Sequence, residues 1–496
     1  MPSEDKTPIR SVIGGGQAGA AATATGRQIS GNIAIQLGGR AIGIATALAT
    51  VPITARTLGP EGFGVLTAGL AYVGIFGSFT ELGLTVAAVN RMAAEPERES
   101  AWLGALTVLR AALSLLATAT CIATIPLLLG NENDIAIVTF VLAFTILPGA
   151  TSSFMAVFQT RLRAAIPQIL AVGQSLLWLG TVITLALLDK GVVAFAVGYV
   201  VVAIALAVAQ IAVTRRFVTV SWSSCWALLR PLVRLALPLG IAAVMILIYY
   251  RIDAVLLLKL SGAEEAGVYA VAYRLLEPLT VLPAIVMSTF FPVLSAVFEQ
   301  DPVRARRLVQ RCAEVMLAIT LPCFAVSLAL ADPIVSLLFG QAYDRSASVL
   351  PILVGAFVSI GFGYLAGFLS PVLGLQWRFA LYSTIGALAN VGLNFVLIPP
   401  YGAYGSATAT LITELLTMAL MLGTALRVLR MRLETGRFAR VLGAAAGMLI
   451  VMLTLRPLGL FLALAGGTAA YAGLILALKV VRPEEIRALR RPEHEM

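Results

Sequence analysis

Four arginines stand inside long apolar stretches of the sequence, at positions 40, 110, 251 and 274. A guanidinium keeps its charge and offers several hydrogen-bond donors in one plane. In an apolar setting it can bind an anion, pair with a carboxylate, or extend its charged end to the polar edge of the apolar layer. Which use applies depends on the neighbours of each arginine.

Four carboxylates also lie within apolar stretches: Glu81, Asp253, Glu277 and Glu414. Glu277 follows Arg274 by three residues, so the two share a helix face and can pair. Asp253 follows Arg251 by two residues, so it lies on a different face. An unpaired carboxylate in a low dielectric can hold a proton, which makes all four candidates for coupling or gating. A salt bridge or a helix-cap contact is the competing interpretation for each.

The sequence has few residues for catalysis, metal binding or cofactor binding. The one histidine is His494, and the four cysteines form no CxxC pair. Phosphate-loop, GxSxG and zinc-site spacings are absent. We therefore expect no catalytic residues, metal ligands or cofactor, and leave open that H⁺ or Na⁺ is a coupling ion.

The elements that must position these charges are long apolar helices. The chain has 496 residues, of which 59% are hydrophobic and 12% charged, and its mean hydropathy is +0.94. A soluble fold of this composition would lack the polar surface to cover itself. Fourteen stretches are expected to be membrane helices: 32–56, 62–90, 101–129, 134–158, 168–188, 192–214, 235–259, 267–298, 305–330, 347–373, 377–398, 402–426, 441–455 and 458–478.

The basic residues predict the orientation of these spans. Most of the 35 Lys and Arg fall in alternate gaps between the stretches, together with both ends of the chain. By the positive-inside rule, both termini are then cytoplasmic. The net charge of +10 is spread over those gaps. It indicates contact with anionic membrane lipids and not with nucleic acid.

Internal repeats predict two lobes. The hairpin LGPEGFGVL at 58–66 resembles LSGAEEAGVYA at 260–270, and GVVAFA at 191–196 resembles GAYGSA at 402–407. Both offsets are close to the length of six helices, as in transporters built from parallel repeats. We expect an all-α polytopic membrane protein with two pseudo-symmetric six-helix lobes around a central cavity. The predicted division is 1–31 mobile cytoplasmic tail, 32–214 first lobe, 215–234 cytoplasmic linker, 235–426 second lobe, 427–478 two extra helices, and 479–496 basic cytoplasmic tail.

Several motifs resemble one known family. They are RTLGPEGFGVL (56–66), ELGL (81–84), NRMA (90–93), YRIDAVLLLKLSGAEEAGVYAVAYRLLE (250–277), FFPVLS (290–295), LLFGQAY (337–343) and NVGLNFVLIPPYGAYGSATAT (390–410). In this order they resemble the polysaccharide-biosynthesis flippases, the Wzx-type oligosaccharide-lipid transporters. Their superfamily also includes multidrug and toxin extrusion pumps and lipid II flippases.

The resemblance implies a substrate and a place. It implies translocation of an undecaprenyl-pyrophosphate-linked oligosaccharide, a repeat unit of O-antigen, capsule or exopolysaccharide, across a bacterial or archaeal cytoplasmic membrane. A polysaccharide polymerase or export complex is an implied partner, and lipopolysaccharide an implied product.

Such a substrate suggests roles for the arginines. Its pyrophosphate cannot cross hydrocarbon unaided, so the transporter needs a cationic cavity. Arg251 and Arg274 are expected to line it, and pairing with Asp253 or Glu277 is the alternative. For Arg40, an anion contact and an extension to the membrane edge are equally favoured. For Arg110, the extension is preferred.

Two other functions remain open. A cation-coupled multidrug exporter, or a lipid II flippase, of the same superfamily would share the fold. The intramembrane arginines speak against a cavity built for cations. A membrane glycosyltransferase or ligase is disfavoured, because the predicted outer loops are short and the longest, 331–346, has no room for a catalytic module.

Overall fold

All secondary structure that the computed structural model describes is helical. It describes residues 18–129, 133–161, 165–222, 224–298, 300–478 and 480. The α-helices are α1 (Ala18–Ser78), α2 (Leu84–Ala94), α3 (Glu99–Leu129), α4 (Asn133–Ala143), α5 (Ile146–Gly149), α6 (Ala156–Thr160), α7 (Ala165–Leu187), α8 (Val192–Thr214), α9 (Trp226–Ser261), α10 (Ala263–Leu276), α11 (Val281–Phe298), α12 (Pro302–Phe339), α13 (Asp344–Val372), α14 (Gln376–Val428), α15 (Thr435–Leu455) and α16 (Leu460–Ala477). Short 3-10 turns are η1 (Pro96–Arg98), η2 (Ala150–Met155), η3 (Glu277–Thr280), η4 (Gln341–Tyr343) and η5 (Arg456–Leu458).

Two of these helices contain a kink at glycine. Gly59 in α1 has φ 66° and Gly402 in α14 has φ 54°, a left-handed region that favours glycine. Each helix therefore holds two of the expected spans. Eleven segments of the described residues are long and apolar enough to cross a membrane. With α1 and α14 counted twice and α9 added, every one of the fourteen expected spans has a helical counterpart.

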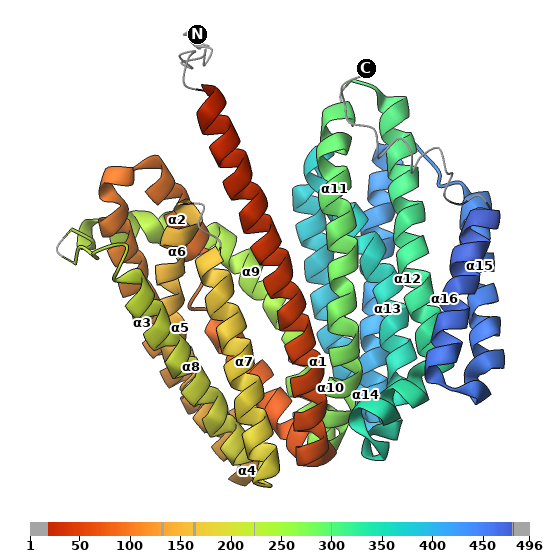
Figure 1. Ribbon diagram of the computed structural model, residues 1–496, viewed down its shortest axis with the longest axis horizontal. Coiled ribbons are helices and arrows are strands. Elements are labelled where there is room, and N and C mark those ends of the chain that lie inside the picture. The colour runs from red at the N-terminus through yellow and green to blue at the C-terminus, as the bar shows by residue number, and fades with distance from the viewer. Residues whose placement is uncertain are drawn as a thin grey trace.

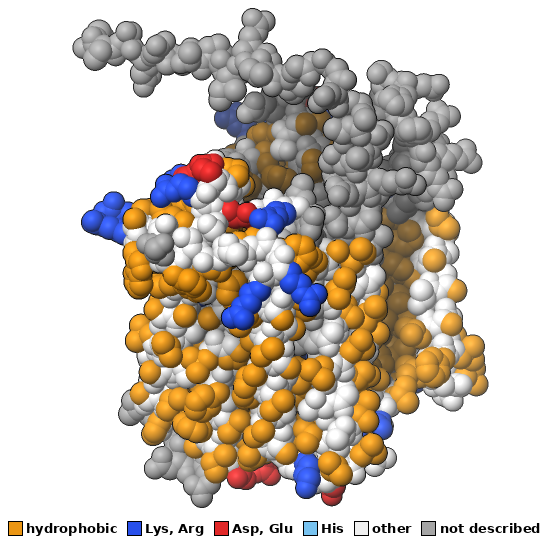
Figure 2. Space-filling view, turned by 60° about the vertical axis from the view of Figure 1, so that its left-hand side comes forward, with side chains coloured by type: hydrophobic (Ala, Val, Ile, Leu, Met, Phe, Trp, Pro, Cys, Tyr) orange, Lys and Arg blue, Asp and Glu red, His pale blue; other side chains and the backbone are white. Residues whose placement is uncertain are grey.

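Hydrophobic side chains cover the flank of the molecule. Figure 2 shows them as a broad band, with the visible charged side chains gathered towards the two ends of the helices. Leu115, Leu116 and Leu187 are among the large apolar residues that are more than half exposed. Such a surface fits lipid and not water. The protein is therefore an all-α, multi-pass membrane protein.

The helices form two bundles (Figure 1). The first bundle contains α2 to α8 and the second contains α10 to α14, with α15 and α16 packed against α12. The long helix α1 lies between them. The bundles meet near the kink of α1 and diverge towards the end where α1 begins. We call these ends the contact face and the start face; α12 and α15 also begin at the start face.

Helix α9 belongs to both bundles. Its first turns, with Leu228, Leu232 and Ala236, share a buried core with α2 and α3. Its last turns, with Val255 and Leu257, belong to the core of the contact face. A Cβ on Gly240 would overlap the backbone of Leu82, so the α9 backbone packs directly on the break between α1 and α2.

Two helix starts differ from the sequence expectation. Helix α1 begins at Ala18, inside the segment expected to be a mobile tail, because AGAAATAT is rich in a strong helix former. Helix α9 begins at Trp226, inside the expected linker, because its first turns bury apolar side chains on the first bundle. Residues 1–17, 479 and 481–496 of the two expected tails lie outside the described residues.

Candidate functional site

A pocket lies between the two bundles on the side of the start face. Its volume is about 380 Å³. Helix α1 contributes Arg40 and the small residues Gly39 and Gly43, and α7 contributes Gln168 and Ser175. The opposite wall holds Arg274 and Glu277, with Pro278, Val281, Leu338 and Phe339. Arg40 on α1 thus faces Arg274 and Glu277 of the second bundle across a mostly apolar space.

The break between α10 and α11 positions the charges of the second bundle. Pro278 follows Glu277 at the start of η3, where the α-helical hydrogen bonds of α10 stop. Arg274 Nη1 lies 2.9 Å from Glu277 Oε2, the pair that their spacing predicts. Both side chains remain partly exposed, at 32% and 43%. The guanidinium therefore has donors left for a ligand in the pocket.

Arg40 faces this pair from α1. Its side chain is exposed, and no ion pair to it is found within the described residues. Together with Arg274 and Glu277 it gives the pocket a net positive charge. The structure thus brings three of the predicted site residues together.

Arg251 lies elsewhere. It is half-buried on α9 and is not part of the pocket lining. No ion pair between Arg251 and Asp253 is found within the described residues; the hydrogen-bond partners of that carboxylate are Tyr269, Asn394 and Thr410.

Asp253 sits at the centre of a buried polar network. It is 7% exposed and accepts hydrogen bonds from Tyr269 Oη at 3.2 Å, Asn394 Nδ2 at 2.9 Å and Thr410 Oγ1 at 3.1 Å. These partners come from α10 and from both halves of α14. All three donors are neutral, so the carboxylate has no counter-charge in this network. Such a site can take up a proton or a small cation.

The network also holds spare acceptors. Asn394 Oδ1 and Ser406 Oγ are buried with no hydrogen-bond partner among the described residues. Asn390 Nδ2 donates to Thr413 Oγ1 at 3.4 Å. Asn390 thus bonds the second half of α14, and Asn394 bonds α9. Nothing in the sequence indicates that Asn394 and Asp253 are partners, since they lie on helices far apart in the chain.

The position of Arg110 differs from the prediction. Its extension to the membrane edge is wrong: the residue is 7% exposed, and Nη1 lies 2.9 Å from Glu81 Oε2 and 3.1 Å from Thr85 Oγ1. Glu81 Oε1 also accepts from the Thr85 backbone N–H at 3.2 Å, at the start of α2. A guanidinium that is buried between helices needs a neighbouring carboxylate to offset its charge. The break after α1 brings that acid to it.

Glu414 is 9% exposed on the second half of α14. The described residues hold no cluster of three or more His, Cys, Asp or Glu that could bind a metal ion.

The contact face closes the space below the pocket. Arg56 Nε donates to the Leu338 carbonyl at 2.9 Å, and Tyr343 Oη donates to the Ala55 carbonyl at 2.9 Å. These bonds join α1 to the end of α12 and to η4. Arg56 and Tyr343 thus hold α1 against the second bundle.

Comparison with known proteins gives relatives of this chain. Residues 53–348 match the family model described as polysaccharide biosynthesis protein. A probable flippase, AglR of Haloferax volcanii, is 26% identical over 261 residues, which are 49% of this chain and 53% of the relative. The chain thus spans about half the length of the curated relative it matches.

Solved structures show the same fold. The lipid II flippase MurJ in an inward closed conformation has a TM-score of 0.74 at 14% identity, and the match covers 93% of this chain and 99% of that one. An inward-facing multidrug resistance transporter of the MATE family has a TM-score of 0.59 at 17% identity, covering 78% and 95%.

Proposed function

Since the chain belongs to the family of polysaccharide biosynthesis proteins, as its motifs predict, we propose that it is a flippase for a lipid-linked oligosaccharide. The substrate is an undecaprenyl-pyrophosphate-linked repeat unit of O-antigen, capsule or exopolysaccharide. It moves from the inner to the outer leaflet of the cytoplasmic membrane. The similarity to a probable flippase supports this class of activity.

One observation supports the substrate above all: the pocket between the bundles carries a net positive charge in a mostly apolar lining. Arg40 and Arg274 reach it from opposite sides. A pyrophosphate that leaves water exchanges its hydration for fixed donors, and the planar fork of arginine suits phosphate oxygens. The polyprenyl chain can stay in the lipid. We keep Arg251, on the helix that crosses between the bundles, as a third proposed contact.

The arrangement of the bundles supports alternating access. Two pseudo-symmetric six-helix lobes that rock about the contact face would open the pocket to either side. In our proposal both termini are cytoplasmic, so the start face is the inner one. The arginines of α12 and α15 at that face fit the positive-inside rule.

We further propose that Asp253 couples transport to H⁺ or Na⁺. Its carboxylate is buried among neutral donors with unpaired oxygen acceptors near by. Neutralising it by either ion would relieve the cost of a buried charge. Glu277, Glu81 and Glu414 are secondary candidates. Glu81 forms an ion pair with Arg110, and Glu277 forms one with Arg274.

The test is translocation by the purified full chain in liposomes. A labelled undecaprenyl-pyrophosphate oligosaccharide in the inner leaflet should become accessible at the outer surface to an enzyme that cannot cross the membrane. Lipid II and a drug serve as competing substrates, because solved structures of the same fold are a lipid II flippase and a multidrug resistance transporter. Transport of either one in place of the oligosaccharide would overturn the proposal.

A further inference from the structure

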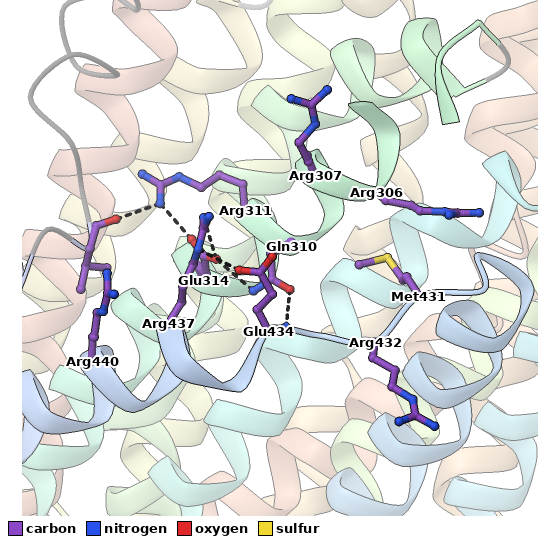
Figure 3. Close-up of a pocket in the computed structure, with 11 residues that line it drawn as sticks. Arg306, Arg307, Gln310, Arg311, Glu314, Met431, Arg432, Glu434, Arg437 and Arg440 are labelled. Atoms are coloured by element: carbon purple, nitrogen blue, oxygen red, sulfur yellow. Dashed lines mark hydrogen bonds and ion pairs between the residues drawn. The ribbon is translucent and has the colours of Figure 1, made fainter. Parts of the chain in front are cut away.

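A second, larger pocket opens at the start face, away from the space between the bundles. Its volume is about 500 Å³. One wall is the first turns of α12, and the other is the loop after α14 with the first turns of α15 (Figure 3). Six arginines line it: Arg306, Arg307, Arg311, Arg432, Arg437 and Arg440. Two acids, Glu314 and Glu434, line it with them.

A buried carboxylate organises the floor of this pocket. The Glu314 side chain is 2% exposed and lies 2.9 Å from Arg311 Nη1 and 3.4 Å from Arg437 Nη1. Gln310 Nε2 donates to the same carboxylate at 2.9 Å, and Arg311 Nη1 donates to the Val480 carbonyl at 2.8 Å. Figure 3 shows these side chains converging from both walls. Two guanidiniums are thus held in place before any ligand arrives.

Among the described residues, the other four arginines of the pocket have no acid partner. Glu434 pairs with Arg437 at 3.1 Å, so both acids of the lining already form ion pairs with Arg311 or Arg437. No ion pair to Arg306, Arg307, Arg432 or Arg440 is found within the described residues. Like charges gathered around one cavity repel each other unless an anion lies between them. Among the described residues, the pocket lining therefore has six arginines against two acids, a net charge of four, and many N–H donors that no acid takes up.

The surroundings favour a ligand from the membrane. Val303 on α12 and Leu442 on α15 are 60% and 52% exposed beside the pocket walls, and both helices continue as apolar spans. An anionic head group can thus reach the arginines while its acyl chains lie along these helices. Basic pockets between membrane helices on the cytoplasmic side bind anionic head groups in this way.

We propose that this pocket binds the phosphate group of an anion, for which an anionic phospholipid head group is the source that the exposed apolar residues favour. Arginine forks bind phosphate oxygens through two parallel hydrogen bonds, which gives both affinity and orientation. A bound head group would tie the α15–α16 pair to α12. The site is separate from the proposed transport pocket and does not depend on the proposed function.

The experiment compares two charge-matched double variants of the full chain. R306Q/R307Q removes two pocket arginines that have no acid partner among the described residues. R304Q/R378Q removes two exposed arginines of the start face that do not line the pocket. Each protein is placed in nanodiscs of phosphatidylcholine with increasing phosphatidylglycerol, and retained phosphatidylglycerol is counted by native mass spectrometry. We expect at least roughly tenfold weaker binding for the first variant and unchanged binding for the second.

A second arm separates the lipid from soluble phosphate. The same proteins in a neutral detergent are titrated with inorganic phosphate, and the midpoint of thermal unfolding is followed. Stabilisation by phosphatidylglycerol alone identifies a lipid head group, and equal stabilisation by phosphate identifies a soluble anion; loss of either effect in R306Q/R307Q supports the site. Equal binding of both ligands by wild type and both variants would overturn it.

A third variant tests whether a loss of binding comes from misfolding of the pocket and not from the missing arginines. E314Q keeps all six arginines but removes the charge that holds Arg311 and Arg437. It should retain phosphate binding, with an affinity closer to wild type than that of R306Q/R307Q. The proposal fails if E314Q loses binding completely while R306Q/R307Q keeps it. In that case the ligands are not Arg306, Arg307, Arg432 and Arg440.

Discussion

Gly64 and Gly267, equivalent positions of the repeated hairpins, pack backbone to backbone where the two bundles meet. A Cβ on Gly64 would overlap the Ala263 carbonyl oxygen and lie 2.7 Å from the Gly267 nitrogen. A Cβ on Gly267 would overlap the Pro60 carbonyl oxygen. Neither position can hold a side chain while the contact face is closed. The repeat that the sequence shows is thus also the place where the bundles touch.

This contact predicts that Gly64→Ala or Gly267→Ala shifts the protein away from the closed contact face. A cysteine introduced by Ser261→Cys, beside that face, should then react faster with a membrane-impermeant maleimide. Gly74→Ala is the matched control, because a Cβ there would meet nothing within 4 Å. Equal labelling of all three variants would mean that the glycine contact does not hold the face closed.

The cationic pocket predicts that Arg40→Ala and Arg274→Ala each lower oligosaccharide translocation about ten- to a hundredfold. A charge-assisted contact is worth roughly 1.5–3 kcal/mol, and about 1.4 kcal/mol is a factor of ten. Lysine at either position should restore part of the rate, since it restores charge without the planar fork. Arg378→Ala, on the same face but outside the pocket, should transport at the wild-type rate.

Pairing alone would give another result for Arg274. If the guanidinium served only to neutralise Glu277, the double variant Arg274→Ala/Glu277→Ala would recover transport in the liposome assay. Such recovery would remove Arg274 from the proposed substrate contacts.

The buried network predicts that Asp253→Asn uncouples transport. An amide at this position cannot exchange a charge, so the rate should no longer respond to an imposed Na⁺ or H⁺ gradient. Abundance in the membrane should stay within about twofold, because the amide oxygen can still accept hydrogen bonds. The exposed Asp189, replaced by Asn, is the control. A gradient response that survives in Asp253→Asn would exclude this residue as the coupling site.

The ion pair of Arg110 predicts a loss of stability. Glu81→Gln should lower the free energy of unfolding by about 1–3 kcal/mol, because it leaves a buried guanidinium without its acid. The double variant Arg110→Leu/Glu81→Leu should be more stable than Glu81→Gln. Denaturation of the purified proteins in detergent measures both. If the double variant is the less stable one, the pair contributes more than its burial costs.

Orientation predicts labelling from opposite sides. A cysteine between residues 261 and 266 should react from outside intact cells. One between residues 301 and 311 should react only after the membrane is opened. Only α10, η3 and α11 separate the two segments. Reaction of both from one side would contradict a single membrane crossing between them.

Local spacing was enough to predict part of this structure. The apolar stretches predicted the helices, because each must be long and uncharged to lie in hydrocarbon. The Arg274–Glu277 pair followed from a three-residue step on one helix. Such features depend on residues that are neighbours along the chain.

Other features depend on where the chain breaks. Arg110 meets Glu81 because the chain turns between the end of α1 at Ser78 and the start of α2, with positive φ at Leu82 and Gly83. An uninterrupted apolar pattern does not show this turn. Asp253 meets Asn394 and Thr410 because Gly402 turns the two halves of α14 side by side against α9. The contacts of Asp253 with α14 join residues more than a hundred positions apart. No periodicity of one helix encodes them.

Because α9 crosses between the bundles, a tilt of this helix near one end moves its other end over a longer distance. From Gly240, where its backbone rests on Leu82, to its end at Ser261 the helix is roughly 30 Å long. A tilt of about 10° at this fulcrum would carry the far end through about 5 Å, close to one helical turn. A small angular change near the start face is thus magnified at the opposite end, and mutations at the fulcrum should alter turnover without touching any ligand.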